Sequence, residues 1–161
     1  ILDELNEDAI IIFNKVDNEE NCQKISEIGL KTNAKILPIY KKCNSKGALN
    51  KIDPISLNEL KEELKNIEVL LIVNENPLDY ITEDDLNSIK KIVTISYFKN
   101  DIVNKSDYVI PGKPWAFKEG SYTNSVNTNQ NFKIAVPDIV NENLSEIEIL
   151  MKISEKLDID L

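Results

Sequence analysis

Three stretches of this chain, residues 41–50, 74–80 and 111–130, combine polar side chains with glycine or proline, and each begins where a run of apolar residues ends. Amides, hydroxyls and carboxylates are the side chains that hydrogen-bond a large polar ligand, and glycine lets a ligand approach the backbone closely. We therefore expect these stretches to bind a large polar ligand or a neighbouring domain. The candidate binding residues are Asn44, Ser45, Gly47, Asn76, Pro77, Glu119, Gly120, Thr123, Asn124 and Gln130.

Catalytic and metal-binding residue types are scarce. The chain has no histidine, so the commonest general base and metal ligand is missing. Its two cysteines, Cys22 and Cys43, are too few for an iron–sulfur cluster and do not have zinc spacing. We expect both to be reduced thiols, with Cys22 in the core on a helix and Cys43 in a loop. The composition argues against a self-contained hydrolase or metalloenzyme, and we expect no catalytic or metal-binding residue.

Length and charge narrow the class of protein further. A chain of 161 residues is the size of one domain, and its net charge of -9 disfavours nucleic acid and anionic membranes as partners. No apolar run approaches the ~20 residues that cross a bilayer, so we expect no membrane insertion. The chain starts at Ile1 without a signal peptide, and we interpret it as a single α/β domain, residues 1–161, from a longer cytoplasmic polypeptide.

Apolar runs alternate with segments of helical periodicity along the chain. Strands are expected at 9–13, 36–40, 69–73, 92–97, 108–110 and 132–136, and helices at 18–32, 56–67, 82–90 and 143–157. Strands that are apolar on both faces belong to parallel sheets with helices on both sides. The pattern predicts a doubly wound, Rossmann-like α/β fold with a mainly parallel sheet. In such folds, ligands bind at the carboxyl ends of the strands, where we expect all three polar stretches to converge.

Two helix starts carry local signals. Ser56 and Glu59 have the spacing of a capping box, which predicts a helix beginning at 56. Thr82 is a candidate cap for the 82–90 helix. The acidic residues 83–85 would then lie in its first turn, where they favour the helix dipole rather than a cation.

The order of four short motifs resembles a known family. They are N-S-K-G-A at 44–48, E-N-P at 75–77, S-D-Y-V-I-P at 106–111 and E-G-S-Y-T-N at 119–124, with Gln130 beyond. This order is similar to the late part of the catalytic subunit of molybdopterin oxidoreductases. It resembles still more the large iron–sulfur subunit of respiratory NADH–quinone oxidoreductase. The chain departs from the pattern at Asn74, where the family has glycine, and at Thr128, where it has arginine.

The resemblance implies a scaffold domain of an electron-transfer protein similar to the large iron–sulfur subunit of NADH dehydrogenase. Its cofactor cleft would be degenerate, because Lys113 and Lys118 are the only cations near the third stretch and the family arginine is lost. The candidate binding residues would then be vestigial, with no cofactor in this part of the protein. Iron–sulfur clusters would be held by other domains of the parent. The implied partners are those domains and other subunits of a complex peripheral to the membrane.

Other interpretations remain open. The domain could belong to a molybdenum or tungsten oxidoreductase such as formate dehydrogenase, which would bind molybdopterin guanine dinucleotide at the three stretches. It could be the nucleotide-binding domain of a thiamine-diphosphate enzyme, which shares the parallel α/β layer. A non-catalytic interaction module would use the same stretches only as surface turns.

Overall fold

The computed structural model describes residues 4–14, 19–137 and 143–159. The chain divides into two compact units. The first contains Ile1–Asp53 and Gly120–Phe132, and the second contains Pro54–Glu119 and Lys133–Leu161. The expectation that all 161 residues form one domain stays a prediction.

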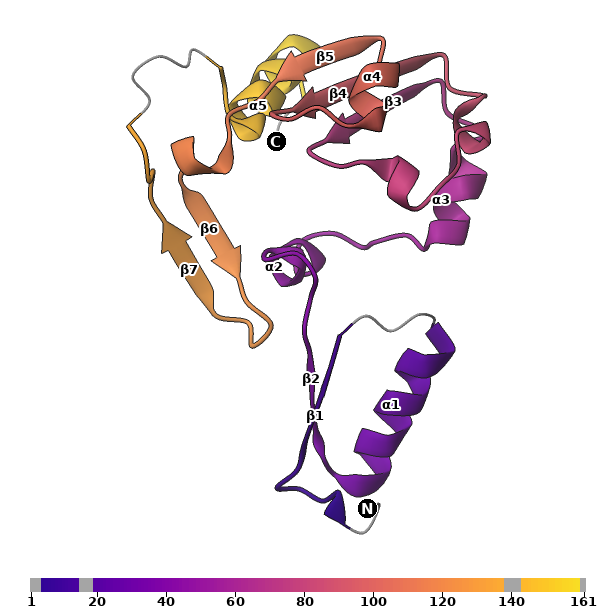
Figure 1. Cartoon of the computed structure of the whole chain (residues 1–161), viewed down its shortest axis with the longest axis vertical. Helices are drawn as coiled ribbons and strands as arrows, with labels where there is room; N and C mark the ends of the chain where they lie inside the picture. The colour runs from indigo at the N-terminus through magenta and orange to yellow at the C-terminus, as the bar shows by residue number, and fades with distance from the viewer. Residues whose placement is uncertain (1–3, 15–18, 138–142, 160–161) are drawn as a thin grey trace. The chain divides into compact units, whose positions relative to one another are not determined.

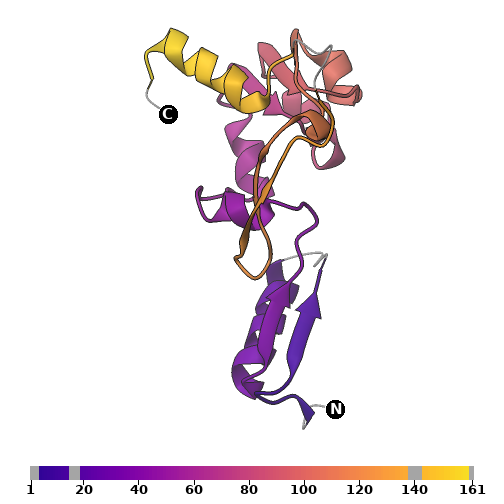
Figure 2. The same cartoon turned by 90° about the vertical axis from the view of Figure 1, so that its left-hand side faces the viewer.

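The first unit contains a parallel pair of strands and an antiparallel hairpin. Its elements are β1 (Ile10–Phe13), α1 (Glu19–Thr32), β2 (Lys35–Pro38), α2 (Ser45–Leu49), β6 (Gly120–Thr123) and β7 (Asn129–Phe132). β1 pairs with β2 in parallel, with Ile11 opposite Ile36. β6 and β7 run side by side as a hairpin in both views (Figure 1, Figure 2).

The second unit is built on a three-stranded parallel sheet in the order β3-β4-β5 (Figure 1). Its longer elements are α3 (Leu57–Glu63), β3 (Val69–Val73), β4 (Lys91–Ser96), α4 (Asp101–Lys105), β5 (Tyr108–Pro111) and α5 (Glu146–Leu157). Three short 3-10 turns connect them: η2 (Pro77–Asp79), η3 (Asp84–Leu86) and η4 (Trp115–Phe117). In register, Leu71 lies opposite Val93, and Val93 opposite Tyr108.

The main core packs against one face of this sheet. Its buried members are Leu64, Ile72, Ile81, Leu86, Ile92 and Ile102. Side chains alternate between the two faces of a strand, so Ile95 points away from Ile92 and lies on the opposite face. Ile95 is fully buried, and Ile149 of α5 is also buried. Apolar side chains are therefore covered on both faces of β4.

The predicted fold class is confirmed: the chain is a mixed α/β structure with parallel sheets and helices, consistent with a doubly wound fold. The capping box is also confirmed, because Ser56 Oγ accepts the Glu59 N–H while the Glu59 carboxylate accepts the Ser56 N–H. None of the helices in the described ranges is long and apolar enough to cross a membrane.

The prediction of a helix at 82–90 is wrong, because only the short turn η3 forms there. Both the backbone N–H and the hydroxyl of Thr82 donate to the Asp85 carboxylate, which fixes a tight local turn. Two of the three acidic residues pair with lysines instead of capping a helix: Glu83 with Lys105 at 2.8 Å, and Asp85 with Lys61 at 3.4 Å.

The prediction of a strand at 132–136 is also wrong, because β7 ends at Phe132. Beyond it, the N–H groups of Ala135 and Val136 both donate to the carbonyl of Ala116 and form no ladder. The sequence pattern predicts loops where α2 and the β6–β7 hairpin form, and it does not predict α4. The expectation of Cys22 in the core is wrong, because both Cys22 and Cys43 are exposed.

Candidate functional site

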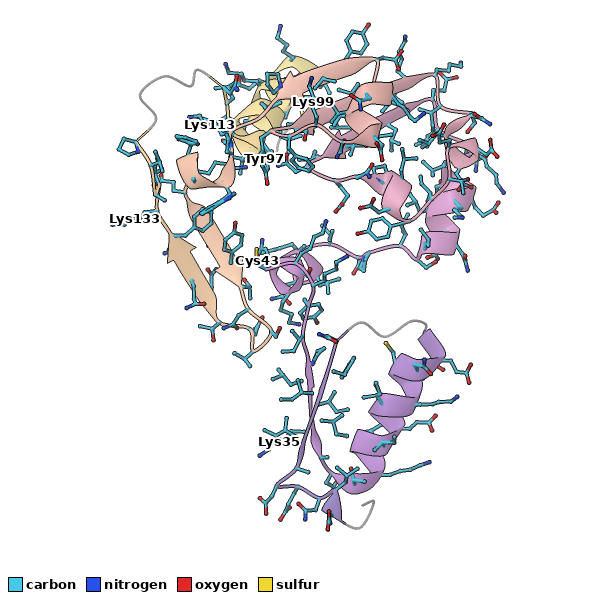
Figure 3. The ribbon with its side chains drawn as sticks, in the orientation of Figure 1. Lys35, Cys43, Tyr97, Lys99, Lys113 and Lys133 are labelled. Atoms are coloured by element: carbon cyan, nitrogen blue, oxygen red, sulfur yellow. The ribbon has the colours of Figure 1, made fainter. Side chains whose placement is uncertain are left out.

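A polar cluster lies at the carboxyl ends of the three parallel strands of the second unit. β3 ends at Val73, β4 at Ser96 and β5 at Pro111, and the next residues are Asn74, Tyr97 and Gly112. Figure 3 labels Tyr97 just beyond the end of β4. Open parallel sheets bind their ligands at this edge. The cluster is therefore the candidate site of the unit.

An ion pair between Lys118 and Glu146 is the centre of the cluster. Lys118 Nζ donates to both carboxylate oxygens of Glu146, at 2.8 and 2.7 Å. Both side chains are only 16% exposed, so the pair is screened far less than an ordinary surface ion pair. The Asn74 side-chain N–H group donates to the same carboxylate. The pair therefore joins the end of β3, the segment after η4 and the start of α5.

Two opposing effects set the pKa of Glu146. Burial raises it, but hydrogen bonds from Lys118 and Asn74 outweigh burial and hold the pKa of the carboxyl below its ordinary value. Glu146 is therefore ionised at neutral pH. A general acid needs the opposite arrangement, so this carboxylate is suited to holding its neighbours in place.

The backbone around the pair is shaped to fit it. Asn74 adopts a positive φ of 50°, which asparagine tolerates better than most residues, and its N–H donates to the Ile95 carbonyl at 2.8 Å. A Cβ atom at Gly112 would lie 3.0 Å from the Glu146 carboxylate. Glycine is thus the residue that leaves room for Glu146. Lys118 Nζ also lies 5.4 Å from the centre of the Tyr97 ring.

Two buried acceptors in this unit have no donor within the described part of the chain. They are the side-chain oxygens of Asn74 and Asn76. Each amide uses its nitrogen instead, Asn74 toward Glu146 and Asn76 toward Asp79 at 2.8 Å. An unpaired buried acceptor costs about 1–3 kcal/mol, so native structures seldom keep one without a reason. A ligand that carries N–H or O–H groups would supply the missing donors.

The predicted residues of the first stretch and the hairpin come together in the first unit. Asn44 Oδ1 accepts the Thr123 N–H at 2.9 Å, which fastens the start of α2 to β6. A Cβ atom at Gly47 would lie 2.3 Å from Asn44 Oδ1 and 3.2 Å from the Thr123 hydroxyl oxygen. Asn44, Gly47 and Thr123 therefore hold secondary structure together. Ser45 is the first residue of α2, and Cys43, two residues before it, is exposed; Figure 3 labels Cys43.

The remaining hairpin residues mostly shape its turn. Asn124 Oδ1 accepts the N–H groups of Val126 and Thr128, at 3.1 and 2.9 Å. Thr128, at the position of the family arginine, is thus part of the turn. Asn127 has a φ of 65°, and its side chain accepts a hydrogen bond from Asn50 at 2.7 Å.

Further predicted residues lie on β6 and β7 or in the second unit. On the hairpin, Gly120 packs against the Phe132 ring, which would lie 3.2 Å from an added Cβ atom, and Gln130 is exposed. In the second unit, Pro77 begins η2 after Asn76, and Glu119 is exposed. Because the three stretches divide between two units, their convergence stays a prediction.

Glu146 is absent from the residues predicted from the sequence. The sequence indicates Lys118 only as a nearby cation, and Asn74 only as the residue that stands where the family has glycine. Ser145 and Glu148 form a second capping box, and that spacing could have placed Glu146 in the first turn of a helix. In the described residues, no group of three or more histidine, cysteine, aspartate or glutamate side chains could hold a metal ion.

Comparison with known proteins gives two relatives, while no family model matches the chain. The chain is 27% identical to the F420-dependent formate dehydrogenase subunit alpha of Methanocaldococcus jannaschii, over 89% of this chain and 23% of that protein. It is 30% identical to the F420-dependent formate dehydrogenase 2 subunit alpha of Methanococcus maripaludis, over 65% of this chain and 16% of that protein. The chain thus spans less than a quarter of the length of these relatives.

These relatives favour one of the interpretations over another. Both are alpha subunits of formate dehydrogenases, so distant similarity to oxidoreductase subunits is established. The comparisons favour the formate dehydrogenase alternative over the NADH dehydrogenase interpretation, which neither of the two relatives supports.

Proposed function

We propose that this chain is part of the alpha subunit of a formate dehydrogenase-like molybdenum or tungsten oxidoreductase. Its second unit would bind the nucleotide end of molybdopterin guanine dinucleotide at the carboxyl edge of β3-β4-β5. The similarity to two formate dehydrogenase alpha subunits supports this class of enzyme. The position of the polar cluster, at the edge where open parallel sheets bind ligands, supports this location.

The unpaired oxygens of Asn74 and Asn76 are the observation that carries the proposal. The Watson–Crick edge of guanine has N–H donors, and ribose has hydroxyl donors. Either could donate a hydrogen bond to an asparagine amide oxygen. Asn76 is a candidate from the sequence, and Asn74 joins it because its amide nitrogen is held by Glu146. The residues present therefore fit the donor-rich end of the cofactor.

The fit to the anionic part of the cofactor is weaker. A pyrophosphate needs cations or free backbone N–H groups, and the family arginine is Thr128 in this chain. Lys99 and Lys113 follow β4 and β5 and are the candidate cations on the second unit; Figure 3 labels both. Lys118 also lies at this edge, where it binds Glu146. We expect other parts of the polypeptide to supply the remaining charge.

The chain's own role in this proposal is binding and orientation. The metal that the cofactor carries would supply the redox chemistry, and domains outside this chain would hold the iron–sulfur clusters. The expected partners are those domains and other subunits of an electron-transfer complex, in the cytoplasm. Asn74 and Asn76 would accept hydrogen bonds from the nucleotide, and the Lys118–Glu146 pair would keep the edge of the sheet in shape.

Calorimetric titration of the chain with GDP tests the proposal, with ADP as the matched ligand. Adenine lacks the ring N–H and presents its amino group elsewhere, so we expect GDP to bind more tightly. Asn76→Ala should weaken GDP binding about 10-fold, in line with the loss of a buried hydrogen bond. Asn58→Ala, at an exposed position of α3, is the control and should leave the affinity unchanged. Equal affinity for both nucleotides, or no effect of Asn76→Ala, would contradict the proposal.

A further inference from the structure

The two buried amide oxygens without a donor belong to side chains that are held in the same way. The amide nitrogen of Asn74 donates to the Glu146 carboxylate, and that of Asn76 donates to the Asp79 carboxylate at 2.8 Å. An ionised carboxylate only accepts hydrogen bonds, so it must face the nitrogen end of an asparagine amide. Each amide therefore turns its oxygen away from the carboxylate that holds it, and neither oxygen has a donor within the described residues.

Asn74 is held more firmly than Asn76. Lys118 Nζ donates to both oxygens of Glu146, at 2.8 and 2.7 Å, so the carboxylate cannot turn without breaking the ion pair. The backbone of Asn74 is fixed as well, because its N–H donates to the Ile95 carbonyl at 2.8 Å. Asp79, by contrast, is exposed. The orientation of the Asn74 amide is therefore set by Glu146.

We propose that Glu146 is a positioning residue that binds the amide nitrogen of Asn74 and so makes this point of the sheet edge a hydrogen-bond acceptor, which selects a ligand group that donates. Asn74, Lys118 and Glu146 all belong to the second unit. The inference rests on the proposed function, in which the ligand is a guanine nucleotide, and it names the group that is recognised. The exocyclic amino group of guanine donates hydrogen bonds, whereas its carbonyl oxygen accepts them. Asn74 accepts from the amino group.

A ligand with an acceptor in place of this amino group would set a second oxygen against the oxygen of Asn74. Neither oxygen would then have a donor, and unpaired buried polar groups oppose binding. Xanthosine diphosphate provides the comparison, because xanthine carries a carbonyl oxygen where guanine carries its amino group. Sites that bind a donor group of the ligand discriminate strongly against an analogue that lacks it. We therefore expect GDP to bind at least about 10-fold more tightly than xanthosine diphosphate.

Calorimetric titration of the full 161-residue chain with the two nucleotides tests the inference. Glu146→Gln replaces the acceptor with an amide that can donate, so the Asn74 amide can turn and offer its nitrogen to the ligand. We expect the preference for GDP, about 10-fold in the wild-type chain, to fall toward equality. The matched control is Glu62→Gln, the same change at an exposed ion pair, which should leave the preference as it is.

The ratio of the two affinities separates positioning from a merely structural role. Loss of structure at the sheet edge would weaken the binding of both nucleotides alike and leave their ratio unchanged. A second variant, Asn74→Gly, makes the same test if Glu146→Gln fails to fold. Glycine tolerates the φ of 50° at this position and removes the amide, so the preference for GDP should again fall.

Three results would overturn the inference. Equal affinity of the wild-type chain for GDP and xanthosine diphosphate would show that no acceptor selects the amino group. A tighter affinity for GDP than for ADP would then still support the proposed function. A preference for GDP that persists in Glu146→Gln or Asn74→Gly would show that other groups make the selection. Absence of binding by either nucleotide would overturn the inference and the proposed function together.

Discussion

Lys118 Nζ lies 2.8 and 2.7 Å from the two carboxylate oxygens of Glu146, although 28 residues separate the two in sequence. The contact joins the segment after η4 to the first turn of α5. Asn74, at the end of β3, binds the same carboxylate. One ion pair therefore holds three distant segments at the carboxyl edge of the parallel sheet, where we place the nucleotide site.

Removing one partner of this pair should destabilise the fold. Lys118→Ala leaves the Glu146 carboxylate half-buried without its cation, and we expect a loss of about 1–3 kcal/mol in the free energy of unfolding. Urea denaturation measures it. The matched control is Lys65→Ala, whose ion pair with Glu62 has the same 2.7 Å distance but side chains that are 63% and 72% exposed. The control should cost less than about 1 kcal/mol. Equal losses would show that burial of the Lys118 pair has no consequence.

The stability that Glu146 contributes should depend on pH. Its pKa is lower in the folded protein than the ordinary value of 4.5, so the contribution is complete above about pH 4.5 and is lost as the pH falls through the folded pKa. The stability difference between the wild-type chain and Glu146→Gln should therefore be largest near neutral pH and shrink in acid. Urea denaturation from pH 7 to pH 3 measures the difference, and the comparison cancels the other carboxylates. A difference that grows in acid would mean that the pKa is raised.

A double-mutant cycle can test the contact between α2 and β6. Asn44→Ala removes the acceptor of the Thr123 N–H and should cost about 1 kcal/mol. Gly47→Ala should also destabilise, because its Cβ would lie 2.3 Å from Asn44 Oδ1. In the double variant that clash is gone, so we expect the two losses to be less than additive by more than about 0.5 kcal/mol. Thermal unfolding of the four proteins measures the coupling, and strict additivity would contradict the contact.

Strands and fold class could be predicted from the sequence where local pattern and tertiary environment agree. Val69–Val73 is apolar at every position, and the predicted strand has the observed bounds. The hairpin was missed because G-S-Y-T and N-Q-N-F lack the alternation of apolar and polar residues that marks a half-buried strand. The prediction of a helix at 82–90 is wrong because the N–H and the hydroxyl of Thr82 both donate to the Asp85 carboxylate, and these hydrogen bonds compete with helix formation. The spacing of apolar residues does not reveal this competition.

The candidate site could be predicted only in part, because local sequence pattern does not reveal contacts between distant segments. Asn76 lies in a recognisable turn at the end of a strand, so its position was visible in the sequence. Glu146 reaches the same edge from a helix 72 residues beyond Asn74, and no local pattern connects two such residues. Motif order did indicate a molybdopterin-type oxidoreductase, but it favoured the NADH dehydrogenase branch, which the relatives do not support. The change of arginine to Thr128 predicts a degenerate site, and that stays a prediction, because the relatives do not test it.

Metal content of the full-length polypeptide, purified without oxygen and measured by mass spectrometry, tests the central claim most directly. The proposed function predicts molybdenum or tungsten in stoichiometric amount together with iron, and release of a guanine nucleotide when the protein is denatured in acid. Iron without molybdenum or tungsten, and without the nucleotide, would contradict it. That result would favour the NADH dehydrogenase interpretation, in which the cofactor cleft is degenerate and binds no cofactor.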